Sequence, residues 1–372
     1  MEVKIAGAGI AGLCAAITLK QLRKNIDISI RDKADSIREK IPRGVNALRN
    51  YSGRTDIQKQ YRDLGFKLDS FHPIMRQIFL LSASKYLEVE SKNRPIFYST
   101  TRGTESSIDN MLLKQATELD VKIQWNSTYK GETIDIFATG AKYTHCIGYG
   151  QHFIDIEETN TIIVLQNSKY CPYGYMCIIP YSKNEASIIL GNFNPSNQSK
   201  LKQDYQRALQ KIPRFQEYIR GATMKHELFG KGNFGLPSSM VNGSTLLVGE
   251  RAGLLEAFRG FGIHNAILSG YAAGYSLANG SNYDNLWREL LYKSLERGLL
   301  RRIAENEMNL SSEQILTKLY DRIPNHVSLE IFRAELRSLE KEFLKTLDLP
   351  VLMNSLNEWI NKYPFSINSL NI

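Results

Sequence analysis

The chain has 372 residues, of which 42% are hydrophobic and 23% charged, and its formal net charge is +9. This length allows a sizeable core in two or three structural lobes, and the composition is ordinary for a soluble protein. No apolar run is long enough to span a membrane. The excess of lysine and arginine is spread along the chain, which favours a basic enzyme surface over a nucleic-acid-binding block, although anionic substrates or membrane lipids would be attracted to it.

Cysteine and histidine spacing argues against a metal site. The four cysteines show no CxxC or metal-binding spacing, and the six histidines form no close pair. We therefore expect reduced thiols in a cytoplasmic protein and no dedicated metal site. The N-terminus leads directly into a predicted strand, so we also expect no signal or transit peptide. The cysteines are Cys14, Cys146, Cys171 and Cys177.

A glycine-rich turn follows the first predicted strand and opens an Ala/Leu-rich helix. Gly7 allows the tight turn, Gly9 lets the backbone approach a pyrophosphate, and Gly12 lets the helix pack closely on the sheet. A second strand ends at Asp32, whose carboxylate can accept hydrogen bonds from ribose hydroxyls, while the helix N-terminus attracts phosphates. The arrangement predicts an adenine-dinucleotide site. The alternative is a glycine turn without a ligand.

The next part of the chain alternates between irregular and periodic segments. Residues 35–60 have no clear period, and we expect a long ordered loop of the kind that often carries function. Apolar runs within 75–100 predict strands, and a helix is predicted from 106 to about 119. A strand is predicted at 121–125, and residues 135–141 are typical of a short buried strand that ends in a glycine turn.

Three strand-like runs between residues 160 and 195 predict an antiparallel sheet that is distinct from the parallel nucleotide fold. A helix is expected near 200–211, a buried strand at 245–250, and a helix rich in small residues from 263 to about 277. Beyond residue 283 helical spacing dominates, with basic residues among the apolar ones. We expect a helical cap with a solvated basic face, and the alternative is peripheral contact with an anionic membrane.

A second glycine-containing segment opens the helix at 263. A buried strand ends in Gly249-Glu250, and Gly260-Phe261-Gly262 follows. With Arg102-Gly103 and the strand at 135–141, these motifs resemble the flavoprotein class that contains aromatic hydroxylases, flavin-dependent halogenases and geranylgeranyl reductases. The Gly-Glu and Gly-Phe-Gly sequences resemble a geranylgeranyl reductase-like family. For Arg102 and the acid that opens the 135–141 strand, the alternatives are a solvated arginine and a surface acid.

The resemblance implies that FAD is the cofactor. Glu250 stands where the class carries an aspartate that contacts the ribityl chain. The positive end of the helix after Gly262 would stabilise reduced flavin. The residues that we assign to FAD are Gly7, Ala8, Gly9, Ile10, Ala11, Gly12, Asp32, Lys33, Arg43, Arg102, Ala138, Thr139, Gly140, Gly249, Glu250, Gly260, Phe261, Gly262 and Ile263.

The strand that follows Cys171 bears on the substrate. It shares Pro172, Tyr175 and Pro180 with geranylgeranyl reductases, and it lacks both tryptophans of the halogenase pattern. By the two-residue period of a strand, alternate side chains would line an apolar cavity over the flavin, and the alternative is an ordinary half-buried strand. The assigned substrate residues are Tyr173, Tyr175, Cys177 and Ile179.

The resemblance implies an FAD-dependent oxidoreductase that transfers a hydride from reduced flavin to a carbon–carbon double bond of a hydrophobic, isoprenoid or lipid-like substrate. Because no second dinucleotide motif is present, we expect an external electron donor, either NAD(P)H or a carrier protein. Tyr175 and His264 are the candidate catalytic proton donors. The alternatives are a flavin-dependent monooxygenase acting on an aromatic or polyketide-like substrate, and a flavin-containing protein without catalysis.

The implied fold class is α/β, or α+β overall. It combines a Rossmann-like FAD-binding domain, an interleaved antiparallel-sheet substrate domain and a helical C-terminal region. The expected boundaries are 1–72, 95–160 and 226–282 for the FAD-binding domain, 73–94 and 161–225 for the substrate domain, and 283–372 for the helical region.

Overall fold

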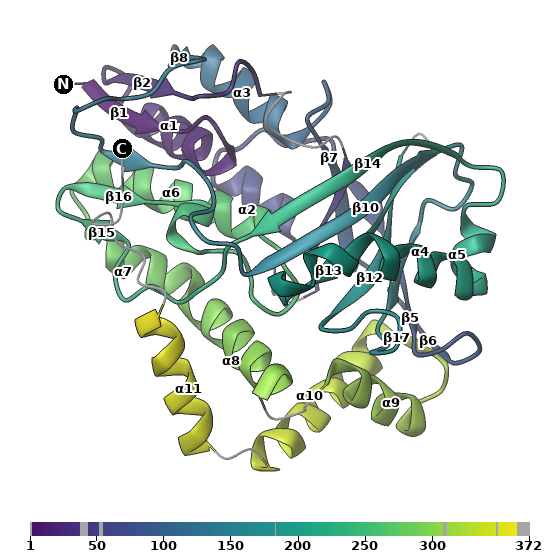
Figure 1. Ribbon diagram of the computed structural model, residues 1–372. Helices are drawn as coiled ribbons and strands as arrows, with labels where there is room; N and C mark the ends of the chain where they lie inside the picture. The colour runs from purple at the N-terminus through teal and green to yellow at the C-terminus, as the bar shows by residue number, and fades with distance from the viewer. Residues whose placement is uncertain are drawn as a thin grey trace.

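Three β-sheets and a set of C-terminal helices make up the fold (Figure 1). The computed structural model describes residues 2–37, 44–51, 55–182, 184–307, 311–346 and 349–362. A parallel sheet near the N-terminus and a larger, mainly antiparallel sheet lie on opposite sides of the molecule, and the last helices extend below both. The mixed α/β organisation expected from the sequence is therefore confirmed.

The first sheet has six strands in the order β15-β16-β9-β1-β2-β8. All of its pairings are parallel except that of β15 with β16. Its interior is a run of apolar residues, as expected for a sheet that is covered by helices. The strands are β1 (Glu2–Ala6), β2 (Asp27–Arg31), β8 (Lys122–Gln124), β9 (Ile136–Phe137), β15 (Val241–Asn242) and β16 (Thr245–Leu247).

Helix α1 (Ile10–Leu22) is buried from Ile10 to Leu19 because it lies between this sheet and two other helices, α3 (Ile108–Glu118) and α6 (Ile263–Asn279). Its Ala-rich sequence gives it little bulk. α6 crosses α1 at backbone contact, since a Cβ atom on Gly270 would lie 2.3 Å from the carbonyl oxygen of Ala11. The same holds for Gly274 against the carbonyl oxygen of Ala15, at 2.4 Å.

The second sheet has eight strands in the order β14-β10-β13-β12-β11-β5-β6-β17. Its pairings are antiparallel except for β11 with β5 and β17 with β6. The strands are β5 (Arg76–Leu80), β6 (Tyr86–Glu90), β10 (Cys146–Ile154), β11 (Thr161–Leu165), β12 (Gly174–Tyr181), β13 (Glu185–Asn192), β14 (Thr223–Gly232) and β17 (His326–Ser328).

Alternate residues of β12 separate the two faces of this sheet. Met176 and Ile178 pack toward α4 (Leu201–Lys211) and α5 (Pro213–Tyr218). Cys177 and Ile179 pack on the other side, toward the small sheet and the C-terminal helices. This alternation is what the strand period predicted for this segment.

Two sequence expectations need correction. The boundaries placed 146–154 and 226–232 in the dinucleotide-binding domain, whereas β10 and β14 belong to the large sheet. Gly148 and Gly150 interrupt the apolar pattern of β10, and at Gly150 the backbone of β13 comes so close that a Cβ atom would lie 2.3 Å from the carbonyl oxygen of Ile188. The C-terminal region, expected to be helical, also contributes β17 to this sheet.

The segment expected as a loop at 35–60 contains regular structure instead. β3 (Gly44–Arg49) pairs with β7 (Phe97–Arg102), and β4 (His72–Ile74) completes a three-stranded sheet. α2 (Ile57–Asp63) begins after the N-cap Asp56, whose side chain accepts hydrogen bonds from the backbone of the first turn. Two stretches of this segment lie outside the described residues.

The remaining helices form the C-terminal part of the fold. α7 continues through a π-helical turn at Arg288–Tyr292 into α8, which runs below the parallel sheet in Figure 1. No helix in the described ranges has the length and apolar character that crossing a membrane requires. All four cysteines are buried and unpaired. The helices are α7 (Tyr283–Trp287), α8 (Lys293–Glu307), α9 (Ser312–Arg322), α10 (Leu329–Thr346) and α11 (Leu349–Lys362).

The close crossing of α1 and α6 makes a prediction about stability. We expect Gly270→Ala to lower the free energy of unfolding by about 1–3 kcal/mol, because the added methyl group must push two helix backbones apart. The better helix propensity of alanine, worth about 1 kcal/mol, offsets only part of this cost. Chemical denaturation measures the change. Gly230→Ala is the control, since its Cβ atom would meet nothing within 4 Å, and equal stability of Gly270→Ala and wild type would contradict the prediction.

Candidate functional site

The glycines of the first turn have two separate roles. Gly7 has a φ of +106°, and a Cβ atom there would lie 2.4 Å from the carbonyl oxygen of Ala138. A Cβ atom on Gly12 would lie 2.1 Å from the carbonyl oxygen of Gly7. These two positions allow the turn and the close packing of α1. A Cβ atom on Gly9 would meet nothing within 4 Å, and Gly9 lines a cavity, so its backbone is open to a ligand.

Asp32 is buried beside this turn and fixes its shape. Its Oδ2 accepts a hydrogen bond from the backbone N–H of Ala8 at 2.7 Å, and its Oδ1 accepts one from Ala34 at 3.0 Å. The acid at the end of β2 therefore holds the glycine turn. Its role toward a ribose stays a prediction.

Two helix N-termini open on the same cavity. α1 begins after Gly9 and α6 after Gly262, and neither helix has a side-chain cap or an acidic residue in its first turn. Both caps line the cavity, together with the first residue of each helix. Free N–H groups and the positive ends of two helix dipoles thus face one space, which suits an anionic ligand.

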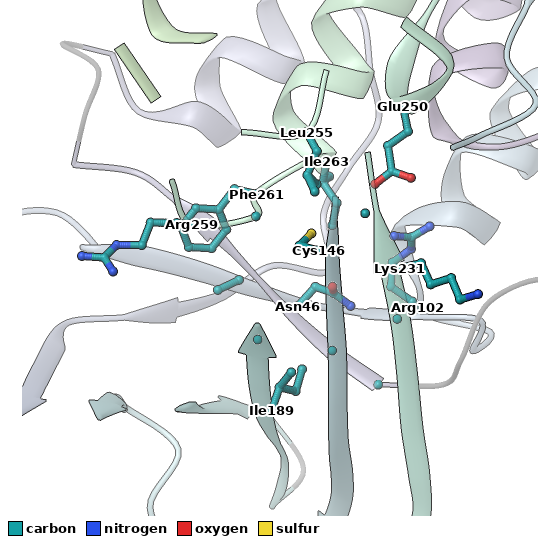
Figure 2. A pocket seen from close by; sticks show the side chains of 18 of the residues that line it. Asn46, Arg102, Cys146, Ile189, Lys231, Glu250, Leu255, Arg259, Phe261 and Ile263 are labelled. Carbon is teal, nitrogen blue, oxygen red and sulfur yellow. The ribbon is translucent and has the colours of Figure 1, made fainter. Parts of the chain in front are cut away.

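The cavity has a volume of about 560 Å³ and extends from the turn after β1 to the large sheet (Figure 2). Figure 2 shows Glu250 and Arg102 on one side, Cys146 and Ile189 toward the middle, and Arg259 beyond the Phe261 ring on the other side. One end of the cavity therefore carries charged groups, whereas Cys146 and Ile189 give its middle apolar surface beside the amide of Asn46.

Arg102, at the end of β7, is held by a buried carboxylate. Its Nε donates to Oδ2 of Asp109 at 2.6 Å, and Asp109 is completely buried at the start of α3. The expected arginine-then-helix element thus exists as an ion pair that fixes the arginine at the cavity wall.

Glu250 follows β16 in a short helical turn, and no hydrogen bond from a described residue reaches its carboxylate. Burial raises the pKa of Glu250 to about 7, and the neighbouring charge of Arg102 acts in the opposite direction. Such a carboxylate is ready to accept hydrogen bonds from hydroxyl groups of a ligand. Its backbone is held by Asn233, whose Nδ2 donates to the Glu250 carbonyl at 2.9 Å.

The turn before α6 is held by two buried charged residues. Glu256 accepts hydrogen bonds from the backbone N–H groups of Phe258 at 3.2 Å and Arg259 at 2.8 Å. Arg302 of α8 donates to the carbonyl oxygens of Ala257 at 3.1 Å and Phe258 at 2.7 Å. The C-terminal helices thus position the Gly-Phe-Gly turn, a role that the sequence did not indicate.

The strand wall forms as expected except at its first residue. Tyr175, Cys177 and Ile179 line the cavity from β12. Tyr173 does not, because it precedes the strand with a φ of +61° and its side chain is 57% exposed. The Tyr175 hydroxyl donates a hydrogen bond to the Arg259 carbonyl, and burial raises the pKa of Tyr175 far above its ordinary value.

His264, predicted as a candidate proton donor, does not line the cavity, whereas its neighbour Ile263 does. Its Nδ1 lies 2.8 Å from the hydroxyl of Tyr61 in α2. Burial, with a smaller contribution from the charge of Arg49, lowers the pKa of His264 to about 4. The side chain is therefore neutral at pH 7 and joins α6 to α2.

The remaining assigned residues divide between the cavity and its support. Arg43 lies outside the described residues, and Lys33 is exposed. Gly7, Ala8, Gly12, Asp32, Lys33 and Thr139 do not line the cavity. Those that do are Gly9, Ile10, Ala11, Arg102, Ala138, Gly140, Gly249, Glu250, Gly260, Phe261, Gly262 and Ile263.

Several cavity residues were missed by the sequence reasoning. Asn46, Cys146, Lys231 and Arg259 line the cavity from β3, β10, β14 and the turn before α6. Asn46 and Arg259 stand in segments that resemble the geranylgeranyl reductase-like family but were assigned no role, and Cys146 and Lys231 belong to no recognisable motif. Only the glycines at 148, 150, 230 and 232, which let strands approach closely, could have indicated that β10 and β14 border a ligand.

No family model matches the chain. It is similar to two curated proteins named digeranylgeranylglycerophospholipid reductase. The protein from Methanocella arvoryzae is 28% identical over 168 residues, 40% of this chain and 41% of the relative. The protein from Methanosphaerula palustris is 27% identical over 231 residues, 57% of this chain and 55% of the relative. The chain thus spans about half the length of the curated relatives it matches.

Solved structures cover more of the chain. A geranylgeranyl bacteriochlorophyll reductase-like protein from Thermoplasma acidophilum matches with a TM-score of 0.71 and 16% identity, over 96% of this chain and 99% of that one. A flavin-dependent brominase matches with a TM-score of 0.59 and 16% identity, over 98% of this chain and 100% of that one. 2-Methyl-3-hydroxypyridine-5-carboxylic acid oxygenase matches with a TM-score of 0.58 and 17% identity, over 83% of this chain and 92% of that one. The expected fold and the resemblance to geranylgeranyl reductase-like proteins are confirmed.

The raised pKa of Glu250 makes a prediction for the FAD-free protein. Its ordinary pKa is 4.5, so the folded state binds the proton more tightly than the unfolded state, and stability is lost as the pH rises from about 4.5 to about 7. Glu250→Gln removes this loss. We expect the free energy of unfolding of the variant, relative to that of wild type, to be about 2 kcal/mol higher at pH 8 than at pH 5. Denaturant unfolding at the two pH values measures this difference. An equal gain at both pH values would contradict the prediction.

The clamp on the turn before α6 makes another prediction. Arg302→Met should lower the free energy of unfolding by about 3 kcal/mol, because two buried carbonyl groups and Glu305 lose their donor. We also expect weaker retention of FAD, because Phe261 and Gly262 follow the clamped carbonyls. Denaturation and gel filtration with absorbance at 450 nm measure the two effects. Arg322→Met, at an exposed site in α9, is the control, and full FAD retention by Arg302→Met would contradict the role of the clamp.

Proposed function

We propose that the protein is an FAD-dependent oxidoreductase that reduces carbon–carbon double bonds of a hydrophobic, isoprenoid or lipid-like substrate. The similarity to two proteins named as reductases supports this function, as does the fold shared with flavin-dependent proteins. One observation carries the proposal. Two uncapped helix N-termini and the carboxylate of Glu250 face a single cavity, and the opposite wall of that cavity is an apolar strand.

The residues present fit FAD. Gly9 leaves open space where a diphosphate would meet the N-terminus of α1. Arg102 is fixed at the wall by Asp109, and Glu250 offers a carboxylate without a hydrogen-bond donor among the described residues. The uncapped N-terminus of α6, which follows Gly262, would stabilise negative charge on a reduced flavin ring bound beside it. Asp32 would hold the ribose while it fixes the turn.

The protein groups around the reacting atoms have separate tasks. Bound FAD supplies hydride transfer to a carbon–carbon double bond. Cys177 and Ile179 are buried and exclude water from the wall on which an apolar chain would lie. Tyr175 keeps its proton over the physiological range because burial raises its pKa, and we assign it as the proton donor on this wall. Its one hydroxyl hydrogen points to the Arg259 carbonyl, so this hydrogen bond has to open before Tyr175 can give the proton to a substrate.

Electrons have to come from outside the chain. Within the described ranges one parallel sheet carries a dinucleotide-binding turn, so we propose that NAD(P)H or a carrier protein reduces the flavin directly. The four buried and unpaired thiols support a reducing compartment such as the cytoplasm. Peripheral membrane contact of the C-terminal helices belongs to this proposal as the route to a lipid substrate.

Anaerobic reduction followed by reoxidation tests the function. We expect fast reoxidation of the reduced protein by an unsaturated polyprenyl lipid, because the apolar wall would hold the chain beside the flavin, and mass spectrometry should find the saturated product. Stopped-flow absorbance at 450 nm gives the rate. Reoxidation by oxygen alone, accelerated by an aromatic ligand, would replace the proposal with a monooxygenase. A purified protein that neither carries nor takes up flavin would overturn it.

A further inference from the structure

Asn46 of β3 places an amide in the middle of the cavity (Figure 2). No hydrogen bond joins its side chain to any residue that the structure describes. Asn192, another amide of the cavity wall, differs in this respect. Its Nδ2 donates to the Pro172 carbonyl at 3.0 Å, and its Oδ1 accepts from the backbone N–H of Asn194 at 2.8 Å. The amide of Asn192 is therefore committed to the fold, whereas that of Asn46 is available to a ligand.

The register of the small sheet shows which way Asn46 faces. Asn46 pairs with Thr100, and Gly44 pairs with Arg102. Because paired residues of an antiparallel sheet share a face, Asn46 and Arg102 lie on one face, two positions apart along the strands. The two chain neighbours of Asn46 belong instead to the core that packs against the large sheet. The amide therefore lies next to the charged end of the cavity that Arg102 marks.

The acidic groups of the cavity wall, among the described residues, are weak acids. Burial is the main cause that raises the pKa of Cys146 and of Cys177, each to about 12. Burial also raises the pKa of Glu250 to about 7. Tyr175 holds its proton more tightly than any of these, and its hydroxyl donates to the Arg259 carbonyl. Protonation of an isolated carbon–carbon double bond needs a far stronger acid than these groups provide.

Hydride addition without prior protonation leaves a negative charge on the substrate. On an isolated double bond this charge stays on carbon, whereas conjugation to a carbonyl group carries it to oxygen. A neutral N–H donor that faces the oxygen stabilises the charge as it develops. The cavity offers such a donor in Asn46, so its chemistry suits a double bond that a carbonyl group activates.

We propose that Asn46 binds a carbonyl oxygen conjugated to the reacting double bond, so that the substrate is an α,β-unsaturated carbonyl compound with an isoprenoid or lipid-like chain. The hydride that reduced FAD supplies adds to the β-carbon, and the electron pair of the double bond moves to the carbonyl oxygen. Nδ2 of Asn46 donates to this oxygen. The α-carbon of the enolate then takes a proton from Tyr175, which water reprotonates.

The position of Asn46 favours the substrate over the cofactor as its partner. The two helix N-termini and Glu250 already provide the polar groups that suit FAD. Asn46 stands beside Cys146 and Ile189, which give the middle of the cavity its apolar surface (Figure 2). A pure hydrocarbon lying there would remove water from the amide without replacing its hydrogen bonds, so the site selects against it. This inference rests on the proposed function for the hydride, and not for recognition of the carbonyl group.

Binding to the oxidised, FAD-loaded protein tests the recognition without turnover. Isothermal titration would compare a saturated C20 isoprenoid ketone with the saturated C20 hydrocarbon, both in neutral detergent. We expect Asn46→Leu, which keeps the size of the side chain and removes its hydrogen bonds, to weaken the ketone about tenfold and the hydrocarbon less than about twofold. Asn25→Leu makes the same exchange at an exposed turn before β2 and should bind both ligands as wild type does.

Anaerobic reoxidation of the reduced protein tests which double bond reacts. Stopped-flow absorbance at 450 nm would compare a C20 isoprenoid enone with the C20 polyprenyl alcohol, which has no conjugated carbonyl group. We expect the enone to reoxidise wild type at least about ten times faster than the alcohol does. Asn46→Leu should slow the enone about a hundredfold and change the alcohol less than about twofold.

The outcomes separate this inference from the proposed function. If the alcohol reoxidises wild type as fast as the enone does, the inference is overturned and the proposed function stands. Binding of the ketone that depends on Asn46, without reduction of either lipid, supports the carbonyl site and overturns the proposed function. A shift of the flavin midpoint potential in Asn46→Leu with unchanged ketone binding would assign the amide to the cofactor and overturn the inference. If Asn46→Leu loses FAD, Asn46→Asp, which keeps the shape and repels a carbonyl oxygen, is judged by the same criteria.

Discussion

The packing of α1 against α6 is the constraint on which the site depends. Glycine at 270 and 274 lets two backbones touch, and this contact sets the positions of both helix N-termini. Gly249 belongs to the same contact, since its Cβ atom would lie 3.0 Å from that of Ala11, and its N–H donates to the hydroxyl of Ser269 in α6. The strand end that carries Glu250, helix α1 and helix α6 are thus packed as one unit.

Two positive helix ends that face one space repel each other and favour an anion between them. The positive charge of Arg102 adds to this effect. The carboxylate of Glu250 opposes it when it is ionised, and burial disfavours its ionisation. The charge on Glu250 near pH 7 therefore depends on what fills the cavity. A ligand that donates hydroxyl groups stabilises the ionised form, whereas an apolar one favours the protonated form.

The two glycine-containing segments of the site could be predicted because their signals are local. The glycine turn, Asp32 and the small-residue helix after Gly262 are encoded within short stretches, and each lies where the pattern placed it. Tyr173 does not join the cavity wall because its left-handed backbone conformation lies just before the strand, which begins at Gly174. The helical period of α6 does not say which neighbour the His264 side chain meets, and in the fold that neighbour is Tyr61.

The rest of the site is built from contacts between distant segments, which no local pattern records. Arg302 reaches back 44 residues to the Phe258 carbonyl, and Gly298, one turn earlier in α8, allows Glu256 to fit, since a Cβ atom there would lie 2.6 Å from Oε1 of Glu256. A basic helical tail that sequence patterning treats as a cap or a membrane contact therefore also holds the turn against the cavity. The same packing places Arg301 and Arg302 of α8 around the Phe258 ring that Arg259 also contacts, so the tail holds this turn through its side chains as well as through its carbonyl groups.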